Sequence, residues 1–451
     1  MMATRYFRFR AVSALTLLLL AAGCTETRFT EATGEGTVRG INAVVELDTV
    51  TFRIEEFALG GVPFKGSSAT VPYDNLSYTF NFDLDVPGES EIRRLASRSV
   101  DVVDQQDYTF VLTGDATSQQ IVLWERTQRD WVGDEGVFEV IVGHLNTTLA
   151  AVDVYLVQTT QVVDPTTLVG TVSFGEQLDA YEAPAGEYQV IVTTQGQPTD
   201  ILFQSIPVTI LGGQTYIAAA FDADPSITGP ASLRLINQGG TAIEVPDDRF
   251  PGTAQFVNAS LGLGNIDVAI DGDFTNLAVT DLEYGEVSPD VDAPSTLTPF
   301  TYVPTGNTMP LLEEDTVVPR GSRDMIILSG PPDGLVTIQL ESPRRGFSTS
   351  TQFRLVSTTT NVDVLDLYLL EPGTDINTVF PTIFGVTRGF NRITTTAPGE
   401  LELTITRLGE KTPLATPEII SLNTNDFVEI ILLDDVDPNA VRTLVYSNIN
   451  P

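Results

Sequence analysis

The sequence predicts an all-β protein made of tandem immunoglobulin-like β-sandwich domains, about four repeats of roughly 105 residues each. Short alternating or apolar runs, rich in valine, isoleucine, threonine and aromatic residues, are separated by glycine, proline and aspartate turns. No stretch sustains an apolar 3.6-residue period, and only a short turn near Glu91 to Ser97 is compatible with a helix. Several motifs also recur at near-constant spacing.

Length and charge limit the functional classes. A chain of 451 residues is too long for one core and indicates three or four domains. Its net charge of −36 repels phosphate backbones, which excludes nucleic acid as a partner. The excess acid serves solubility or, alternatively, collects cations at a cell surface, and we favour solubility. A single cysteine excludes an intramolecular disulfide.

The N-terminus reads as an export signal. Three arginines precede an apolar run over residues 11–22, which is shorter than the ~20 residues of a transmembrane helix. Residues 1–23 are therefore expected to be a signal peptide. Residues 24–36, with Cys24 at their start, are polar and contain glycine, as a flexible tether does.

The segment Leu20-Ala21-Ala22-Gly23-Cys24 resembles a bacterial lipobox, although its leucine stands one position further from the cysteine than is usual. The resemblance implies a lipid on Cys24 and thus a membrane partner, since each buried CH₂ contributes ~0.8 kcal/mol. Thr25, in place of the aspartate that retains lipoproteins in the inner membrane, implies the outer membrane of a Gram-negative cell envelope.

Two strand motifs recur in all four repeats. The first is an opening strand that ends in a polar residue: Asn42, His144, Ser260 and Ser357. The second is a late strand that begins at Tyr108, Tyr216, Met325 and Phe427, with separations of 108, 109 and 102 residues. We expect β-sandwich repeats over 37–135, 136–249, 250–346 and 347–451. Because a solenoid repeats every ~20–50 residues, these are expected to be separate beads with separate cores.

Two further motifs are absent from the first repeat, which therefore reads as a degenerate copy. One is an alternating strand with a central aspartate: Asp153, Asp267 and Asp366. The other is an aromatic-glycine pair: Phe174-Gly175, Tyr284-Gly285 and Phe384-Gly385. On an alternating strand, an aspartate between two inward residues faces outward. We therefore expect a structural role for these carboxylates.

Residues 138–221 resemble the family called domain of unknown function 4397. The matching motifs are the strand ending in His144, Ala151-Val-Asp-Val-Tyr155, Phe174-Gly175, Ala183-Pro-Ala-Gly-Glu-Tyr188, Val208-Thr-Ile210 and Gly213-Gln-Thr-Tyr216. The third and fourth repeats match more weakly. The resemblance implies an exported β-sandwich protein with domains in tandem, and it assigns no catalytic residue.

Residue chemistry offers no clear catalytic site. His144 is the only imidazole and occupies a position where other repeats have asparagine or serine, so it reads as a polar strand end. No Gly-x-Ser-x-Gly motif is present, and zinc sites of histidine and cysteine are excluded. We expect no catalytic residue and no cofactor.

Calcium and sugar are two ligands for which the residues offer candidates, each beside a structural reading. Calcium candidates are Asp271, Asp273, Asp290, Asp292, Asp434, Asp435 and Asp437, none with EF-hand spacing. Asp-Gly pairs also suit turns on geometry alone. Trp124 and Trp131 are the only tryptophans, and Trp131, in an expected linker, is the more exposed candidate for a sugar platform.

These features favour a non-enzymatic, lipid-anchored cell-envelope protein that presents sandwiches to a protein or glycan partner, or that acts as a spacer. The alternative is a polysaccharide hydrolase with a carboxylate pair, which requires a pocket with two acids ~5–10 Å apart. A third possibility is a subunit of a larger outer-membrane complex, with exposed apolar patches on the first and fourth repeats.

Overall fold

The structure is a computed structural model that describes residues 32–133, 135–158, 163–224, 229–342 and 345–447. The expected signal peptide, residues 1–23, and the expected lipidation residue, Cys24, lie outside these residues. Within them the chain forms strands and one 3₁₀ turn, η1 (Ile376–Thr378), and no helix is long and apolar enough to cross a membrane. The expected helical turn near Glu91 is wrong, because residues 93–101 form a strand paired with its neighbour along nearly its whole length.

Four β-sandwiches follow one another, as predicted. The first has sheets of β4 (Val71–Asp74), β1 (Glu35–Asn42), β7 (Gln106–Gly114) and β8 (Gln119–Thr127), and of β3 (Phe57–Val62), β2 (Val50–Ile54), β5 (Ser77–Leu84) and β6 (Arg93–Asp101). The second has sheets of β12 (Tyr181–Pro184), β9 (Val137–Leu145), β16 (Thr215–Asp222), β17 (Ala231–Ile236) and β18 (Ala242–Val245), and of β11 (Leu168–Val172), β10 (Val152–Gln158), β13 (Gly186–Thr194) and β14 (Gln197–Gln204), with β15 (Val208–Ile210) on β13.

The third and fourth sandwiches repeat the four-plus-four pattern. The third has sheets of β22 (Val291–Ala293), β19 (Gly252–Ala259), β25 (Arg323–Ser329) and β26 (Val336–Glu341), and of β21 (Val279–Leu282), β20 (Ile266–Ile270), β23 (Thr298–Pro304) and β24 (Leu312–Thr316). The fourth has sheets of β30 (Asn391–Thr396), β27 (Thr351–Ser357), β33 (Phe427–Asp434) and β34 (Val441–Ser447), and of β29 (Ile383–Val386), β28 (Leu365–Leu370), β31 (Gly399–Arg407) and β32 (Glu418–Leu422).

One sheet of every sandwich is built around a parallel pair. The opening strand runs parallel to the late strand in β1–β7, β9–β16, β19–β25 and β27–β33. All other strand pairs within the sheets are antiparallel. The two recurrent strand motifs of the sequence therefore lie side by side at the centre of the same sheet.

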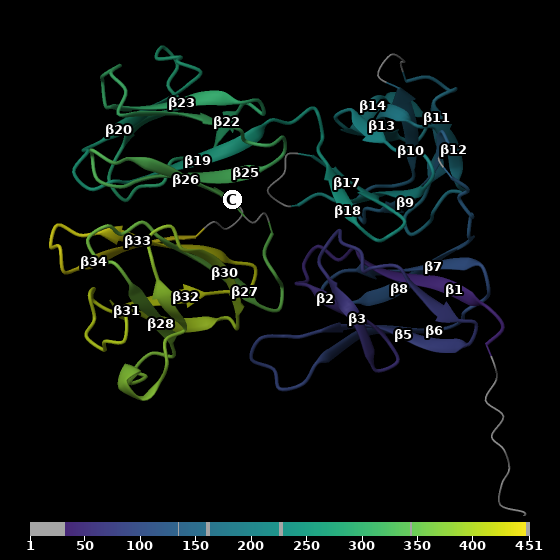
Figure 1. Cartoon of the computed structure of the whole chain (residues 1–451), viewed down its shortest axis with the longest axis horizontal. Helices are drawn as coiled ribbons and strands as arrows, with labels where there is room; N and C mark the ends of the chain where they lie inside the picture. The colour runs from purple at the N-terminus through teal and green to yellow at the C-terminus, as the bar shows by residue number, and fades with distance from the viewer. Residues whose placement is uncertain (1–31, 134, 159–162, 225–228, 343–344, 448–451) are drawn as a thin grey trace, which may run out of the picture.

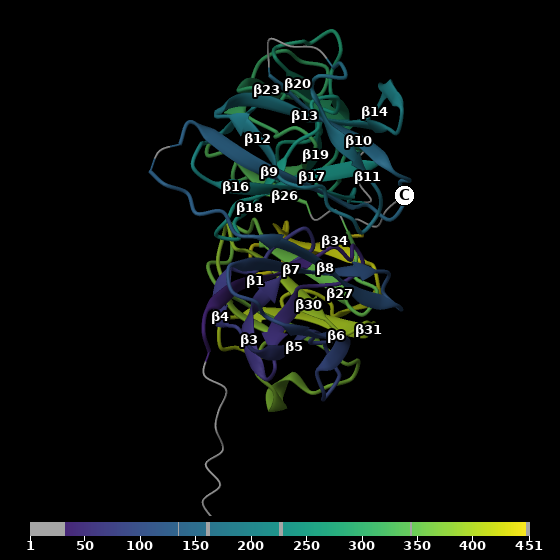
Figure 2. The same cartoon turned by 90° about the vertical axis from the view of Figure 1, so that its right-hand side faces the viewer.

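The four sandwiches form a closed square instead of a string of beads. Figure 1 shows the first and second sandwiches on one side, the third and fourth on the other, and the fourth beside the first. In Figure 2 the first and fourth form one layer, and the second and third form the other. The first and fourth are joined where Ser348 donates its backbone N–H to the carbonyl of Glu46, at 2.9 Å.

Each sandwich has a core of its own, as expected, but the central sheets bury both of their faces, so that further clusters join the sandwiches in pairs. In β9, Val140 and Val142 point into the second sandwich, while Ile141 belongs to an apolar cluster shared with the first. A matching cluster joins the third and fourth sandwiches and includes Met325 and Ile431. Successive residues of these strands point to opposite faces, and both faces carry apolar side chains. The sheets therefore stack in pairs to bury the outer face.

The aromatic-glycine motif marks a left-handed turn that binds the end of the opening strand. The residue in this turn donates its N–H to the carbonyl of the strand's polar residue: Gly175 to His144, Gly285 to Asn258, Gly389 to Ser357 and Lys65 to Asn42. Three expectations change. The fourth repeat uses Arg388-Gly389 instead of Phe384-Gly385, the third places Asn258 where Ser260 was expected, and the first has Phe64-Lys65.

Candidate functional site

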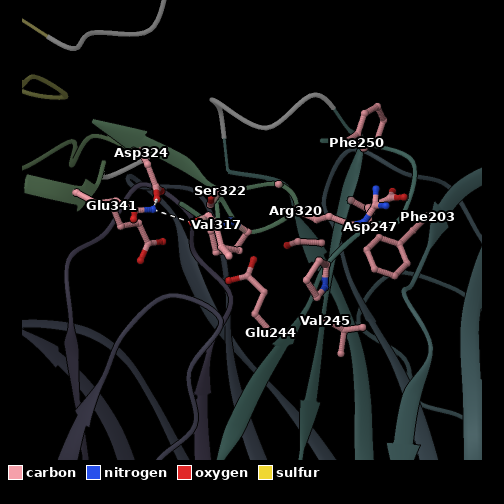
Figure 3. Close-up of a pocket in the computed structure, with 16 residues that line it drawn as sticks. Phe203, Glu244, Val245, Asp247, Phe250, Val317, Arg320, Ser322, Asp324 and Glu341 are labelled. Atoms are coloured by element: carbon pink, nitrogen blue, oxygen red, sulfur yellow. Dashed lines mark hydrogen bonds between the residues drawn. The ribbon is translucent and has the colours of Figure 1, made fainter. Parts of the chain in front are cut away.

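The candidate site lies where the sandwiches meet. A pocket of about 480 Å³ separates the second sandwich from the third (Figure 3). The second sandwich and the linker after it contribute an apolar wall that includes Phe203, Val245 and Phe250. The third contributes a polar wall that includes Ser322 and Asp324. A volume in this range suits a small organic ligand.

A second pocket of about 330 Å³ adjoins the first at the centre of the square. Its lining comes from all four sandwiches and from the linker before the fourth: Phe64, Lys65, Asp224, Arg234, Glu244, Glu341, Ser342, Arg345, Phe347, Gln352 and Ile393. Glu244 and Glu341 line both pockets, so the two pockets adjoin around one central space. We call the two pockets together the central site.

Lys65 connects the first sandwich to the second at the central site. Its ammonium lies 2.5 Å from the carboxylate of Asp224 and 3.1 Å from that of Glu244, and its side chain is 3 % exposed. Arg234 pairs with the other oxygen of Glu244 at 3.0 Å. Lys65 has φ +60, where the second, third and fourth repeats have glycine. A lysine held in a conformation that costs ~1 kcal/mol must be stabilised by its surroundings, here by two carboxylates.

Arg345 connects the linker before the fourth sandwich to the first. Its guanidinium donates to the carbonyls of Val45 and Leu47 at 2.9 and 2.5 Å. It also lies over the rings of Phe64 and Phe347, with centroid distances of 5.1 and 4.8 Å. Burial lowers the pKa of Arg345 to about 10, against the opposing effect of nearby aspartates, and the group stays charged at neutral pH.

The central site contains several buried polar atoms that no hydrogen-bond partner satisfies. Among the described residues ten such atoms occur, and four of them line this site: Ser322 Oγ, Asp324 Oδ1, Ser342 Oγ and Arg234 Nε. Asp324 is 4 % exposed, and its other carboxylate oxygen accepts from the amide of Gln339 at 2.6 Å. An unsatisfied buried polar group costs ~1–3 kcal/mol, so such a concentration requires an explanation.

His144 is a structural residue, in agreement with its repeat position. It is fully buried, its Nδ1 accepts from the N–H of Asn146 at 3.2 Å, and its Nε2 lies 2.9 Å from the carbonyl of Ala150. Asn42 and Asn258 likewise accept from the N–H two residues ahead. The imidazole of His144 thus accepts the same main-chain hydrogen bond as the asparagine of the first and third repeats. Burial lowers the pKa of His144.

The repeated aspartates are structural, but they are buried instead of solvent-facing. Each sits on the outer face of its strand and binds the N–H of a left-handed glycine in the next hairpin: Asp153 to Gly196, Asp267 to Gly306 and Asp366 to Gly409, at 2.7 to 2.9 Å. Their exposed fractions are 5 %, 3 % and 2 %. The sequence pattern predicted the direction of these side chains but not the loops that cover them.

Four of the calcium candidates accept hydrogen bonds from main-chain N–H groups, and a fifth, Asp290, pairs with Arg323 at 3.0 Å. Asp273 accepts from Thr275 and Asn276 in a turn that lowers its pKa to about 2, and Asp434 accepts from the N–H groups of Thr360 and Asn361. Asp435 and Asp437 each accept from an N–H two residues ahead, and Asp271 has φ +55. Across the described residues, no three histidine, cysteine or acidic side chains form a group that could hold a metal ion.

The two tryptophans differ as the sequence suggested. Trp124 is 4 % exposed, packs between the first two sandwiches and donates to the carbonyl of Gly175 at 2.8 Å. Gly143 makes room for it, because a Cβ there would lie 2.3 Å from the indole ring. Trp131 is partly exposed and carries the guanidinium of Arg129 at 3.9 Å from its ring. Trp124 is thus excluded as an open sugar platform.

Sequence reasoning missed the residues of the central site. Lys65 stood out only as one of two lysines, and nothing near Ser322, Asp324 or Arg345 forms a motif. The partners come from different sandwiches, and Lys65 and Asp224 are 159 positions apart. Only an aligned comparison of the four repeats, with lysine at a left-handed glycine position, could have identified one of them.

Comparisons with known proteins identify no family. No family model matches the chain, and no curated protein does. Among solved structures, a family 26 carbohydrate-binding module from Eubacterium rectale Amy13K in complex with maltoheptaose shares 12% identity over 41% of this chain and 91% of its own, with a TM-score of 0.14. The Bacillus anthracis TIE protein shares 10% over 90% and 69%, with a TM-score of 0.16.

A putative cell adhesion protein from Parabacteroides distasonis shares 10% identity over 70% of this chain and 99% of its own, with a TM-score of 0.14. Likenesses this low carry no argument about ligand or partner. The β-sandwich assignment stands on the strand pairing of the chain itself.

Proposed function

We propose that this protein is a non-enzymatic, lipid-anchored component of the bacterial cell envelope that binds a ligand where its four sandwiches meet. The central site, formed where the sandwiches meet, is the observation that carries the binding role. A spacer needs no inward-facing polar groups, whereas here buried polar atoms without partners gather at the junction. The resemblance of the N-terminus to a lipobox supports the anchor.

Anchoring is tested by fractionation. The full chain is expressed in a Gram-negative host with labelled fatty acid, beside Cys24→Ala. Label and membrane association are expected for the wild type and not for the variant, because Cys24 is the only thiol in the chain. Equal distribution of both proteins would refute the anchor.

Binding is tested with soluble residues 25–451. Thermal shifts are measured with fragments of cell-envelope and environmental polysaccharide, envelope proteins and calcium. A ligand at 100 times its Kd stabilises the protein by ~2.7 kcal/mol. Product analysis accompanies the screen, because release of shorter glycans would favour the hydrolase. If no material raises the melting temperature and none is cleaved, the binding proposal fails and the chain is a spacer.

A further inference from the structure

The unsatisfied atoms of the central site specify what could satisfy them. Asp324 Oδ1 only accepts a hydrogen bond, Arg234 Nε only donates one, and the hydroxyls of Ser322 and Ser342 do either. A ligand that completes this set must therefore offer both donors and acceptors. A hydroxyl group does both, whereas an ammonium group only donates and a carboxylate only accepts.

The charge of the central site points away from an ionic ligand. Its lining has five acidic residues and four basic ones, in a chain that has 60 acidic and 24 basic residues. Glu244 is matched by Lys65 and Arg234, and Asp247 by Arg249 at 2.6 Å. Strong excess of either sign would attract an ion, and this near balance favours an uncharged ligand.

The opposite wall suits the apolar face of a ring. Phe203, Val245 and Phe250 line the larger pocket across from Ser322 and Asp324 (Figure 3). A pyranose presents C–H groups on its faces and hydroxyls on its edge, which matches one apolar wall and one polar wall. Ligand sites commonly combine an apolar lining with a few oriented polar groups.

We infer that the central site binds a neutral saccharide, with its hydroxyls toward Ser322 and Asp324 and a ring face toward Phe250. This inference rests on the proposed binding function and names its ligand class. The smaller pocket, with Arg234 and Ser342, continues the site toward the centre of the square, so that a second sugar unit is accommodated there.

The test is calorimetric titration of residues 25–451 with four classes of ligand. The first is neutral di- and trisaccharides built of glucose, galactose or mannose. The others are the cationic sugar glucosamine, the anionic sugar glucuronate and the alkyl alcohol hexan-1-ol. A neutral saccharide is expected to bind, and the charged sugars and hexanol at least tenfold more weakly. Asp324→Asn keeps the shape and the bond to Gln339 but removes the charged acceptor, so affinity falls at least tenfold.

Controls separate the site from general effects. Asp333→Asn removes an exposed acid of the same sandwich and leaves affinity unchanged. Phe250→Ala, on the other wall, weakens binding independently, which keeps the test decisive if Asp324→Asn unfolds. Equal affinity in wild type, Asp324→Asn and Phe250→Ala would place the sugar elsewhere and overturn the inference.

Two other results also overturn it. If ordered waters alone occupy the four atoms in a crystal soaked with the saccharide panel, water is the natural partner of these groups. If envelope protein shifts the melting temperature and no saccharide does, the saccharide inference fails while the proposed binding function stands. If no material of any class binds, both the saccharide inference and the proposed binding function fail.

Discussion

The two stacked interfaces place different chemistry at the same positions. In the second sandwich Ile141 of β9 lies beside Ile217 of β16, in the apolar cluster that faces the first sandwich. In the fourth, the corresponding residues of β27 and β33 are Arg354 and Glu429, which are 2 % and 0 % exposed and form a bidentate ion pair. Burial raises the pKa of Glu429, and Arg354 opposes that shift.

The stacking of these sheets therefore requires complementary contacts across the interface, not a particular class of residue. Arg354 also donates to the carbonyl of Glu341 at 2.6 Å, which ties the fourth sandwich to the last strand of the third. Apolar contact between two isoleucines, in contrast to these hydrogen bonds, does not depend on direction. At these positions the second interface is therefore held by a directed ion pair, whereas the first is held by apolar packing. The polar contacts of the first interface lie elsewhere, at Lys65 and Trp124.

Breaking the ion pair should have the largest effect. Glu429→Ala leaves the guanidinium of Arg354 buried without its partner, and such losses cost ~3–5 kcal/mol. Hydrogen exchange of β27 and β33 in the mature chain measures this, since a four-domain protein does not unfold in one step. Exchange in the second sandwich serves as the internal control. A change below ~1 kcal/mol would mean that water reaches the pair.

Replacing both partners should have a smaller effect of the opposite sign. The double variant Arg354→Ile, Glu429→Ile copies the residues of the second sandwich, and well-packed apolar replacements of buried ion pairs are neutral or stabilise by ~1–4 kcal/mol. The same exchange measurement reports it. Loss of stability as large as in Glu429→Ala would show that the bond to Glu341 dominates the interface.

Lys65 allows the left-handed turn to be compared between repeats. Lys65→Met removes the ion pairs with Asp224 and Glu244 but keeps a side chain at φ +60, and should cost ~2 kcal/mol. Lys65→Gly loses the same pairs but restores the residue of the other repeats, so its cost should be ~1 kcal/mol smaller. Thermal melting orders the two variants. The reverse order would mean that the backbone at Lys65 is unstrained.

The smallest effect concerns pH. Burial holds the pKa of His144 below the ordinary value of 6.5, so its contribution to stability is complete above pH 6.5 and is lost as pH falls through the folded pKa. We expect the second sandwich to lose protection below pH 6.5. His144→Asn, which copies Asn42 and Asn258, should abolish this part of the pH dependence. The single imidazole can be titrated directly by NMR, and a raised pKa would contradict the assignment.

The sequence predicted the repeated architecture because strand alternation and turn residues are local. The late strands beginning at Tyr108, Tyr216, Met325 and Phe427 all lie beside their opening strands. It failed where partners are distant. Phe384-Gly385 matches the aromatic-glycine pattern in sequence. The turn that binds Ser357, however, is formed by Arg388-Gly389, which has no aromatic residue. The central site escaped prediction because its residues meet only after the sandwiches stack.

The bond between Ser348 and Glu46 closes the square, and closure determines how far the protein extends. Four sandwiches in a line would carry the last one four domain lengths from a bilayer. Folded into two layers, the chain returns its fourth sandwich to the level of the first (Figure 2). If the chain is anchored as proposed, an array of this shape is two domains tall and two domains wide, and its footprint, more than its height, sets how densely it can cover a membrane.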